Sequence, residues 1–352
     1  MATPRDPDAF ARLVEPYRSE LHAHCYRMLG SLHDTEDALQ DALLRAWRGL
    51  GGFDGRSSLR AWLYKIATNT CLDVIGRRPR RALPIGAVGA ADPHEGVGTP
   101  MAESVWVEPY PAERLEDGYA GPDAHYELRE SIELAFIAAL QHLPATQRAV
   151  LILREVLGFS AQEVAETLDT TVAAVNSALQ RARKAVDERL PDRSQAQTLR
   201  ALGDDELRAI VEGYMDAMAS GDVERVVAML TEDAAWSMPP LASWFRGADV
   251  RVFLETGPLS GRFRWRHRPT WANGQLAIGT YTLHGAEGAY AAFSLDVLTL
   301  REGRIADVTA FIARSSEQRS AEELADFPDQ PADADRVAAY FERFGLPARL
   351  DA

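Results

Sequence analysis

Apolar residues recur at helical intervals in the first part of the chain. Between residues 8 and 81, Leu39 and Trp47 lie on one side of a predicted helix, and a second helical run follows a glycine pair. Asp34 precedes the first run and is expected to be its N-cap, with an acidic first turn behind it. Residues 127–190 return to the same periodicity. Both stretches are therefore expected to be all-helical.

The last part of the chain mixes two periodicities. Residues 204–316 open with an amphipathic helical pattern and continue with four runs that favour strands. Asn273-Gly274 and Glu302-Gly303 are hairpin-turn pairs between those runs. Helices followed by a strand meander predict an α+β domain. A partly helical tail is expected over residues 317–352.

Residues 82–126, between the two helical stretches, are rich in proline, glycine and acidic residues. Such a composition buries little apolar surface, so an extended or disordered linker is expected. The run Trp106–Tyr110 (WVEPY) is the exception, and we expect it to dock on another part of the chain.

The net charge of −14 argues against a simple basic nucleic-acid binder, but the charges are unevenly distributed. Residues 56–81 hold seven basic residues against the single acid Asp73, whereas residues 82–130 hold two basic and ten acidic residues. The two cysteines do not suit a disulfide scaffold, and no signal pattern opens the chain. No apolar run approaches the ~20 residues that span a bilayer. A cytoplasmic protein without a membrane partner is expected.

Residues 160–186 have the pattern of a helix-turn-helix. Ser160 and Glu163 form a predicted capping box, Asp169 opens a tight break, and a second helix begins near Thr171. The outer face of the second helix would present side chains that suit base edges and phosphates: Asn176, Ser177, Gln180, Arg181, Arg183 and Lys184. An ordinary helical hairpin with a solvated charged face is the alternative.

Basic and aromatic residues are interleaved between Arg56 and Arg81. Trp62 and Tyr64 stand among arginine and lysine residues, a combination that suits melted or single-stranded nucleic acid. Alternatively, Trp62 belongs to the core and the arginines are merely solvated.

Together these stretches resemble the extracytoplasmic-function (ECF) class of bacterial sigma factors. Tyr17–Arg81 is similar to region 2 of that family, most strongly at Asp34–Asp41 (DTEDALQD) and at Phe53–Asn69. Leu143–Val186 is similar to region 4. Residues 205–315 resemble the SnoaL-like, ketosteroid-isomerase-like cone fold, so the chain is similar to the subgroup that carries this extension.

The resemblance implies a multidomain fold class: two all-α sigma domains, a region 2 helical bundle and a region 4 helix-turn-helix, followed by an α+β SnoaL-like cone domain. The expected domains are region 2 over 8–81, an acidic flexible linker over 82–126, region 4 over 127–190, the cone domain over 204–316 and a tail over 317–352. The implied function is an alternative sigma factor for promoter recognition, DNA melting and transcription initiation, with a fused regulatory or sensing domain. No enzyme activity and no cofactor are expected.

The resemblance also implies two partners, core RNA polymerase and promoter DNA. The clamp helices of the largest polymerase subunit would bind Asp34, Asp37, Gln40, Asp41 and Leu44, and the flap of the second-largest subunit is a further partner. The −10 element would be melted and read by Arg56, Arg60, Trp62, Lys65, Asn69, Arg77 and Arg78. The −35 element would be read by Thr171, Asn176, Ser177, Gln180, Arg181, Arg183 and Lys184. The acidic linker would either mimic nucleic acid in a polymerase channel or serve as a tether.

Two residues depart from the family pattern. Ala178 stands where many relatives have arginine, so promoter specificity is not carried over. Asp169 replaces the usual turn glycine, and aspartate tolerates a left-handed conformation better than most residues.

A cone fold holds a pocket against a curved sheet, and the candidates to line it are Tyr214, Trp236, Met238, Trp244, Trp265, His267 and Asp307. His267 and Asp307 could serve acid–base chemistry if they met. Three roles stay open for this domain: catalysis, binding of a small-molecule ligand, and an interaction that controls the sigma core. His22, His24 and Cys25 are interpreted as structural, and no metal is expected, because these residues do not share one helix face.

Two other functions compete with that of a sigma factor. One is a SnoaL-like enzyme of the cyclase or isomerase type with attached DNA-binding segments. The other is a classical helix-turn-helix regulator. Retention of the whole acidic helix argues against the enzyme, and the regulator leaves the Arg56–Arg81 stretch unexplained.

Overall fold

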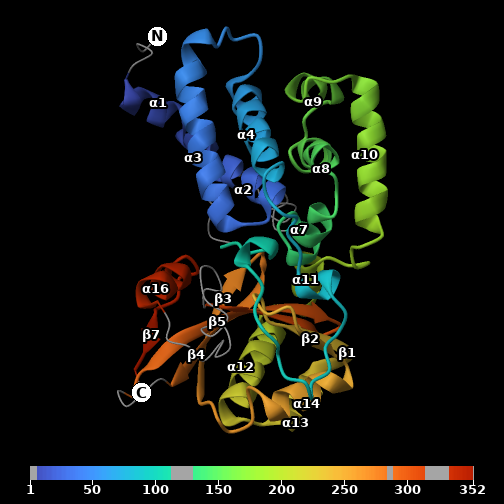
Figure 1. Cartoon of the computed structure of the whole chain (residues 1–352), viewed down its shortest axis with the longest axis vertical. Coiled ribbons are helices and arrows are strands. Elements are labelled where there is room, and N and C mark those ends of the chain that lie inside the picture. Colours follow the sequence, from blue (N-terminus) through green and yellow to red (C-terminus); the bar gives the residue numbers. More distant parts are fainter. Residues whose placement is uncertain (1–5, 112–129, 284–287, 314–332, 352) are drawn as a thin grey trace. The chain divides into compact units, whose positions relative to one another are not determined.

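The computed structural model describes residues 6–111, 130–283, 288–313 and 333–351. The chain forms two compact units. The helical unit consists of Met1–Arg81 and Val107–Asp192, and the sheet unit of Ala82–Trp106 and Arg193–Ala352. Figure 1 shows the helices of the first in blue and green and the strands of the second in yellow to red.

The first half of the helical unit is a bundle. It comprises α1 (Pro7–Val14), α2 (Arg18–Leu29), α3 (Leu32–Gly49) and α4 (Leu59–Ile75), with 3₁₀ turns at Glu15–Tyr17 and Leu50–Gly52. Helix α2 ends at Gly30, whose φ of 66° is the left-handed conformation that glycine adopts without strain. The N-cap of α3 is Ser31, so the assignment of Asp34 to that position was wrong. Asp34 lies one turn further in, where its backbone amide donates to the Ser31 hydroxyl.

The second half of the helical unit carries the helix-turn-helix. Its elements are α7 (Leu134–Gln141), α8 (Ala145–Leu151), a π-helical turn (Ile152–Val156), α9 (Ala161–Thr167) and α10 (Val172–Asp187). Helix α10 packs against α8 and α9, and helix α4 of the bundle also contacts α8 and α9. The two halves therefore form one compact unit.

The sheet unit is an α+β domain, as the alternating patterns predicted. Its sheet has the strand order β2-β1-β6-β5-β4-β3, with β1 and β6 parallel and the other neighbours antiparallel. The strands are β1 (Leu230–Ser237), β2 (Trp244–Arg246), β3 (Trp265–Ala272), β4 (Gln275–Leu283), β5 (Tyr290–Arg301) and β6 (Arg304–Ile312). The helices before the tail are α11 (Gln195–Leu202), α12 (Asp204–Ser220), α13 (Val223–Met229) and α14 (Ala248–Thr256). Helix α12 packs on β3 and α14 on β1 and β2, and this encloses the core.

The C-terminal tail packs onto strands β4 and β5. Helix α16 (Ala334–Glu342) contacts β5, and strand β7 (Arg349–Leu350) pairs with β5. Between them, Leu346 lies against Gly279, where a β-carbon would come within 2.5 Å of the leucine side chain. The tail can therefore sit this close to the sheet only because residue 279 has no side chain.

Residues 82–106 differ from the flexible linker that their composition predicted. They form a short helix α5 (Pro84–Ala87) and a 3₁₀ turn (Glu103–Val105), and they pack within the sheet unit. The indole Nε1 of Trp106 donates to the Pro240 carbonyl at 3.0 Å, and that of Trp244 donates to the Val88 carbonyl at 2.9 Å. Backbone bonds from the Ala91 amide to the Trp244 carbonyl and from the Met101 amide to the Pro240 carbonyl add to these side-chain bonds. Residues 112–126 of the expected linker lie outside the described residues.

Replacement of Trp106 by alanine should release this segment from the sheet unit. The side chain is 3% exposed, so its loss should cost about 3–5 kcal/mol. Backbone amides of residues 82–106 should then exchange hydrogen much faster than in the unsubstituted chain. Trp271→Ala is the matched control because Trp271 is 41% exposed in the same unit. Equal protection of this segment in both variants would show that Trp106 does not anchor it.

Candidate nucleic-acid and polymerase interface

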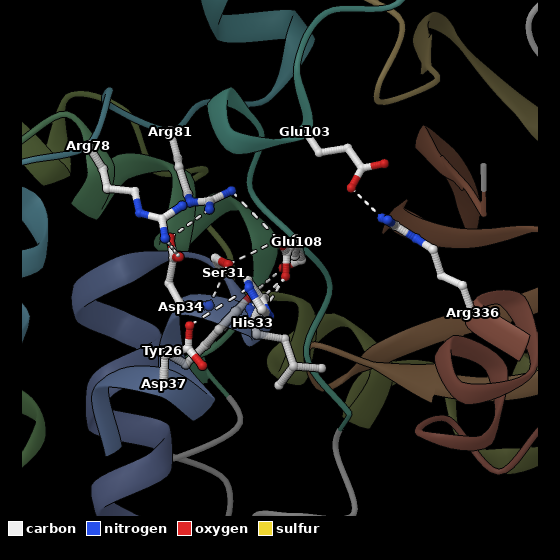
Figure 2. Close-up of polar contacts among 11 residues, drawn as sticks. Tyr26, Ser31, His33, Asp34, Asp37, Arg78, Arg81, Glu103, Glu108 and Arg336 are labelled. Atoms are coloured by element: carbon white, nitrogen blue, oxygen red, sulfur yellow. Dashed lines mark hydrogen bonds and ion pairs between the residues drawn. The ribbon is translucent and has the colours of Figure 1, made fainter. Parts of the chain in front are cut away.

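The N-terminus of α3 is capped by two side chains. Ser31 Oγ accepts from the Asp34 amide at 3.1 Å, and the Glu108 carboxylate accepts from the Leu32 amide at 2.7 Å (Figure 2). The Ser31 hydroxyl also donates to Glu108 at 3.0 Å. Three more hydrogen bonds hold Glu108 in place. Its amide donates to the Gly30 carbonyl, and its carbonyl accepts from the Tyr26 hydroxyl. The backbone amide of His33 donates to the Glu108 carboxylate. The expected docking of Trp106–Tyr110 thus places a carboxylate at the positive end of the α3 dipole.

Asp34 forms a buried ion pair. Its carboxylate is 2.7 Å from Arg81 and 3.1 Å from Arg78, and the residue is 3% exposed (Figure 2). Arg81 also lies 3.7 Å from Glu108. These contacts connect α3, the segment that follows α4 and the Glu108 segment. Because its carboxylate is buried and paired, Asp34 does not offer an exposed surface to a protein partner.

The other four residues assigned to polymerase binding lie on the exposed surface of α3. Asp37, Gln40, Asp41 and Leu44 follow one another at helical spacing and share one face. Leu44 is 45% exposed, and Asp37 forms a surface contact with His33 at 3.7 Å. An exposed leucine beside carboxylates is a surface that a protein partner can cover.

Two basic residues of α4 contact the second half of the unit. Lys65 donates to the Glu166 carbonyl at 2.7 Å and to the Asp169 carboxylate at 3.0 Å. The Arg60 guanidinium lies 4.9 Å from the Phe159 ring centre and forms an ion pair with Glu20 at 3.0 Å. In this arrangement neither cation is free for a DNA phosphate.

The remaining residues assigned to the −10 element are distributed over both ends of α4. Arg56 is exposed before the helix and pairs with Asp54, whereas Arg77 is exposed after it. Trp62 is half-buried and packs against Phe53 with ring centres 5.1 Å apart. Asn69 is half-buried and Arg78 is engaged by Asp34. These residues thus lie before, within and after α4, and they differ in exposure.

The helix-turn-helix has the local structure that its sequence predicted. Both halves of the capping box are present between Ser160 and Glu163, and Asp169 has a φ of 49° in the turn. Thr171 caps α10 through its hydroxyl, which accepts from the Ala174 amide at 3.2 Å. Val172 is exposed, because it is the first residue of α10.

Helix α10 presents a continuous polar face. The residues assigned to the −35 element are all exposed: Thr171, Asn176, Ser177, Gln180, Arg181, Arg183 and Lys184. Several of them border an open groove of about 730 Å³ together with Arg154. Ala178 is buried on the opposite side, so this position contributes nothing to the exposed face. A recognition helix needs amide and guanidinium groups on one accessible side, and α10 provides them.

The interior of the sheet unit contains a large apolar core. Tyr214, Trp236 and Met238 are buried in it, and the rings of Tyr214 and Trp236 are 6.4 Å apart. Trp244 and Trp265 are buried as well, and Trp244 donates to the linker segment. The residues that were expected to line a pocket are thus buried side chains, most of them in this core.

His267 and Asp307 do not meet. They lie on β3 and β6, which β4 and β5 separate, so about 14 Å of sheet stands between their strands. His267 borders an open cavity of about 420 Å³ beside Arg266 and Arg268, and burial lowers its pKa to about 4. Burial raises the pKa of Asp307 to about 6. No acid–base pair is formed by these two residues.

The histidines of α2 have structural partners. His22 is 2.8 Å from the Tyr110 hydroxyl and His24 is 2.9 Å from the Thr68 hydroxyl. Burial lowers the pKa of His24 to about 3, with the charges of Arg27 and Arg60 adding to the effect. Within the described residues, no group of three or more His, Cys, Asp or Glu side chains could hold a metal ion.

Two carboxylates to which the sequence assigned no role accept hydrogen bonds in the structure. Glu108 caps α3. In the sequence it is recognisable as the acidic residue within the otherwise uncharged run Trp106–Tyr110. Asp296 is buried in β5 and accepts from Ser294 at 2.7 Å and from Thr280 at 2.9 Å. Its signal is a charged residue in an apolar strand. Burial raises the pKa of Asp296 to about 6, although both hydroxyl hydrogen bonds act in the opposite direction.

Comparison with known families agrees with this architecture. Residues 13–81 match Sigma-70 region 2, residues 133–186 match Sigma-70 region 4, and residues 211–308 match the SnoaL-like domain. Together these matches define an RNA polymerase sigma factor with a fused SnoaL-like domain.

The chain belongs to the ECF RNA polymerase sigma factor family. It is 44% identical over 306 residues to the ECF RNA polymerase sigma factor SigG of Mycobacterium tuberculosis (strain ATCC 25618 / H37Rv), which covers 86% of this chain and 81% of the relative. It is also 31% identical to SigW of Bacillus subtilis (strain 168), over 53% of this chain and 91% of that relative. The crystal structure of Mycobacterium tuberculosis SigJ aligns with a TM-score of 0.53 at 25% identity, over 86% of this chain and 95% of that one.

This membership confirms the prediction of an ECF sigma factor with a fused SnoaL-like domain, and it confirms the predicted fold class. As a sigma factor, the chain acts in transcription initiation with core RNA polymerase and promoter DNA. Of the helices that the structure describes, none is long and apolar enough to cross a membrane.

Removal of the buried carboxylate should destabilise the helical unit strongly. Asp34→Asn leaves Arg81 buried beside one remaining carboxylate, and breaking a buried pair costs about 3–5 kcal/mol. The matched control is Asp37→Asn on the same helix, whose surface contact should be worth less than about 1 kcal/mol. Urea unfolding followed by circular dichroism measures the difference. Similar midpoints for the two variants would contradict a supporting role for Asp34.

Asp296 should make the stability of the sheet unit depend on pH. The folded carboxyl has a pKa of about 6 against 3.8 for the free group, so between these values only the folded state keeps the proton. The free energy of unfolding should therefore fall as pH rises from about 4 to about 6 and stay lower above that range, by about 3 kcal/mol.

Asp296→Asn should consequently be more stable than the unsubstituted chain at pH 7.5 and nearly equal to it at pH 4. The asparagine can keep both hydroxyl contacts. Thermal unfolding at both values measures the effect, with Asp216→Asn on the exposed face of α12 as the control. A stability gain that does not change between the two pH values would refute the assigned titration.

Proposed function

We propose that this sigma factor binds core polymerase through the exposed face of α3, which consists of Asp37, Gln40, Asp41 and Leu44. The observation that carries the proposal is the exposure of these four side chains together, with an apolar residue at the end of an acidic row. The clamp helices of the largest polymerase subunit are the partner for this face, and the flap of the second-largest subunit is the partner for region 4. Asp34 supports the helix from inside.

Promoter DNA would be bound by two surfaces. Helix α10 would read the −35 element with its exposed amide and guanidinium groups, and the residues around α4 would melt and read the −10 element. Before Lys65 can contact DNA, its hydrogen bonds to Glu166 and Asp169 have to break. Region 4 would therefore have to move away from α4 when the factor engages a promoter. Such a factor works in the cytoplasm, with the polymerase and the chromosome.

The SnoaL-like domain would act as an interaction domain that controls the sigma core. The separation of His267 from Asp307 and the apolar core around Trp236 favour this role over catalysis. Residues 82–106, which were considered as a nucleic-acid mimic or a tether, would be held by this domain through Trp106 and Trp244. A small-molecule ligand of the domain remains the second candidate role, on the strength of the cavity beside His267.

Charge reversal on α3 tests the proposal. The double variant Asp37→Arg/Asp41→Arg should lose core binding and run-off transcription by more than about tenfold, because like charges across an interface cost several kcal/mol. Glu212→Arg/Asp216→Arg is the matched control, since it places the same reversals at the same spacing on the exposed face of α12.

Each outcome has a definite meaning. Loss of transcription in the α3 variant alone, with promoter DNA binding retained, supports polymerase binding by this face. Unchanged core binding in the α3 variant would show that another surface binds the polymerase. Equal losses in both variants would trace the effect to net charge rather than to the face.

A further inference from the structure

A cavity of about 160 Å³ in the helical unit is surrounded by arginines. Arg78, Arg80 and Arg81 contribute from the segment after α4, and Arg148 contributes from α8. Asp34 is the only carboxylate among the described lining residues. Arg78 and Arg81 both pair with Asp34, so no described carboxylate of the lining offsets the charges of Arg80 and Arg148.

Arg148 is a buried cation that has no carboxylate partner among the described residues. It is 4% exposed and donates to neutral acceptors: the carbonyls of Met28, Gln141 and Leu143 and the side-chain oxygen of Gln141. Its Nε has no hydrogen-bond partner although the atom is buried. A buried guanidinium donor without a partner is costly unless a further acceptor reaches it.

Further positive charge lies beside this cavity. Within the described part of the chain, Arg80 and Arg189 have no carboxylate at ion-pair distance, just as Arg148 has none. Burial lowers the pKa of Arg80, and the charge of Arg189 adds to it. His142 has its pKa lowered by burial first and then by Arg80, Arg189 and Arg148. Such mutual repulsion would be relieved by an anion.

We propose that this cavity is a binding site for a small phosphate anion, held by the guanidinium groups of Arg80 and Arg148. Of the Arg148 donors, only Nε has no protein acceptor, so Arg148 would contribute this single donor and Arg80 its guanidinium group. The cavity is large enough for one or two phosphate groups. The ligand is a free phosphate group rather than the DNA backbone, because Arg148 is buried beneath neighbouring residues. The site goes beyond the proposed function, which assigns no role to Arg80 or Arg148.

The anion would also connect the two halves of the unit. Arg80 follows α4 of region 2, whereas Gln141, Leu143 and Arg148 belong to region 4. A ligand bound by both regions stabilises the arrangement in which they are packed together. This is the same arrangement in which Lys65 is bound to Asp169.

Calorimetric titration of the full chain with inorganic phosphate tests the site. Saturable binding is expected, and Arg80→Gln should weaken it by at least about tenfold, because charged hydrogen bonds are strong. Arg77→Gln is the matched control: Arg77 is exposed four residues before the end of region 2 and does not line the cavity. Its variant should bind phosphate as the unsubstituted chain does. Arg80 is itself exposed, so its replacement should leave the fold intact, which circular dichroism checks.

Three results would overturn the proposal. One is the lack of saturable phosphate binding at constant ionic strength. Another is an equal loss of affinity in the Arg80→Gln and Arg77→Gln variants, which would indicate general surface attraction. The last is weakened binding of a short DNA duplex in Arg80→Gln with no effect on phosphate, which would assign Arg80 to the DNA backbone. None of these measurements contains polymerase, so their outcome is independent of the test of α3.

Discussion

The helical unit depends on one buried carboxylate and the cations around it. Asp34 lies inside the first turns of α3, where Arg78 and Arg81 reach it from the segment after α4. Glu108 reaches the same arginine and caps the helix from a segment more than seventy residues away in sequence. An ion pair at this depth is stable only when every partner is in place, so the three segments form together.

This support has a consequence for the surface of α3. The side chain of Asp34 is used inside the unit, which leaves the next turns of the helix to present Asp37, Gln40, Asp41 and Leu44 outward. A helix that is capped and anchored at its N-terminus presents its exposed face in a defined orientation. Aspartate thus has two roles on α3: the buried Asp34 supports the helix, whereas the exposed Asp37 and Asp41 form part of its surface.

Arginines have a comparable division of roles. Those on α10 are exposed, where they can approach a duplex, whereas Arg148 is buried among the carbonyls at helix ends. Arg60 and Lys65 lie between these cases, because they are held by partners from the second half of the unit. Regions 2 and 4 therefore limit each other's access to DNA when they are packed together.

The sequence by itself determined the local elements and the family. The capping box at Ser160, the turn at Asp169 and the strand meander after residue 260 all depend on neighbouring residues, and local conformational preferences suffice to specify them. Only the tertiary structure decided that Asp34 is buried, that His267 and Asp307 stand apart, and that residues 82–106 pack within the sheet unit. These outcomes depend on partners distant in sequence, such as Arg81, Glu108 and Pro240, whose proximity no local pattern encodes.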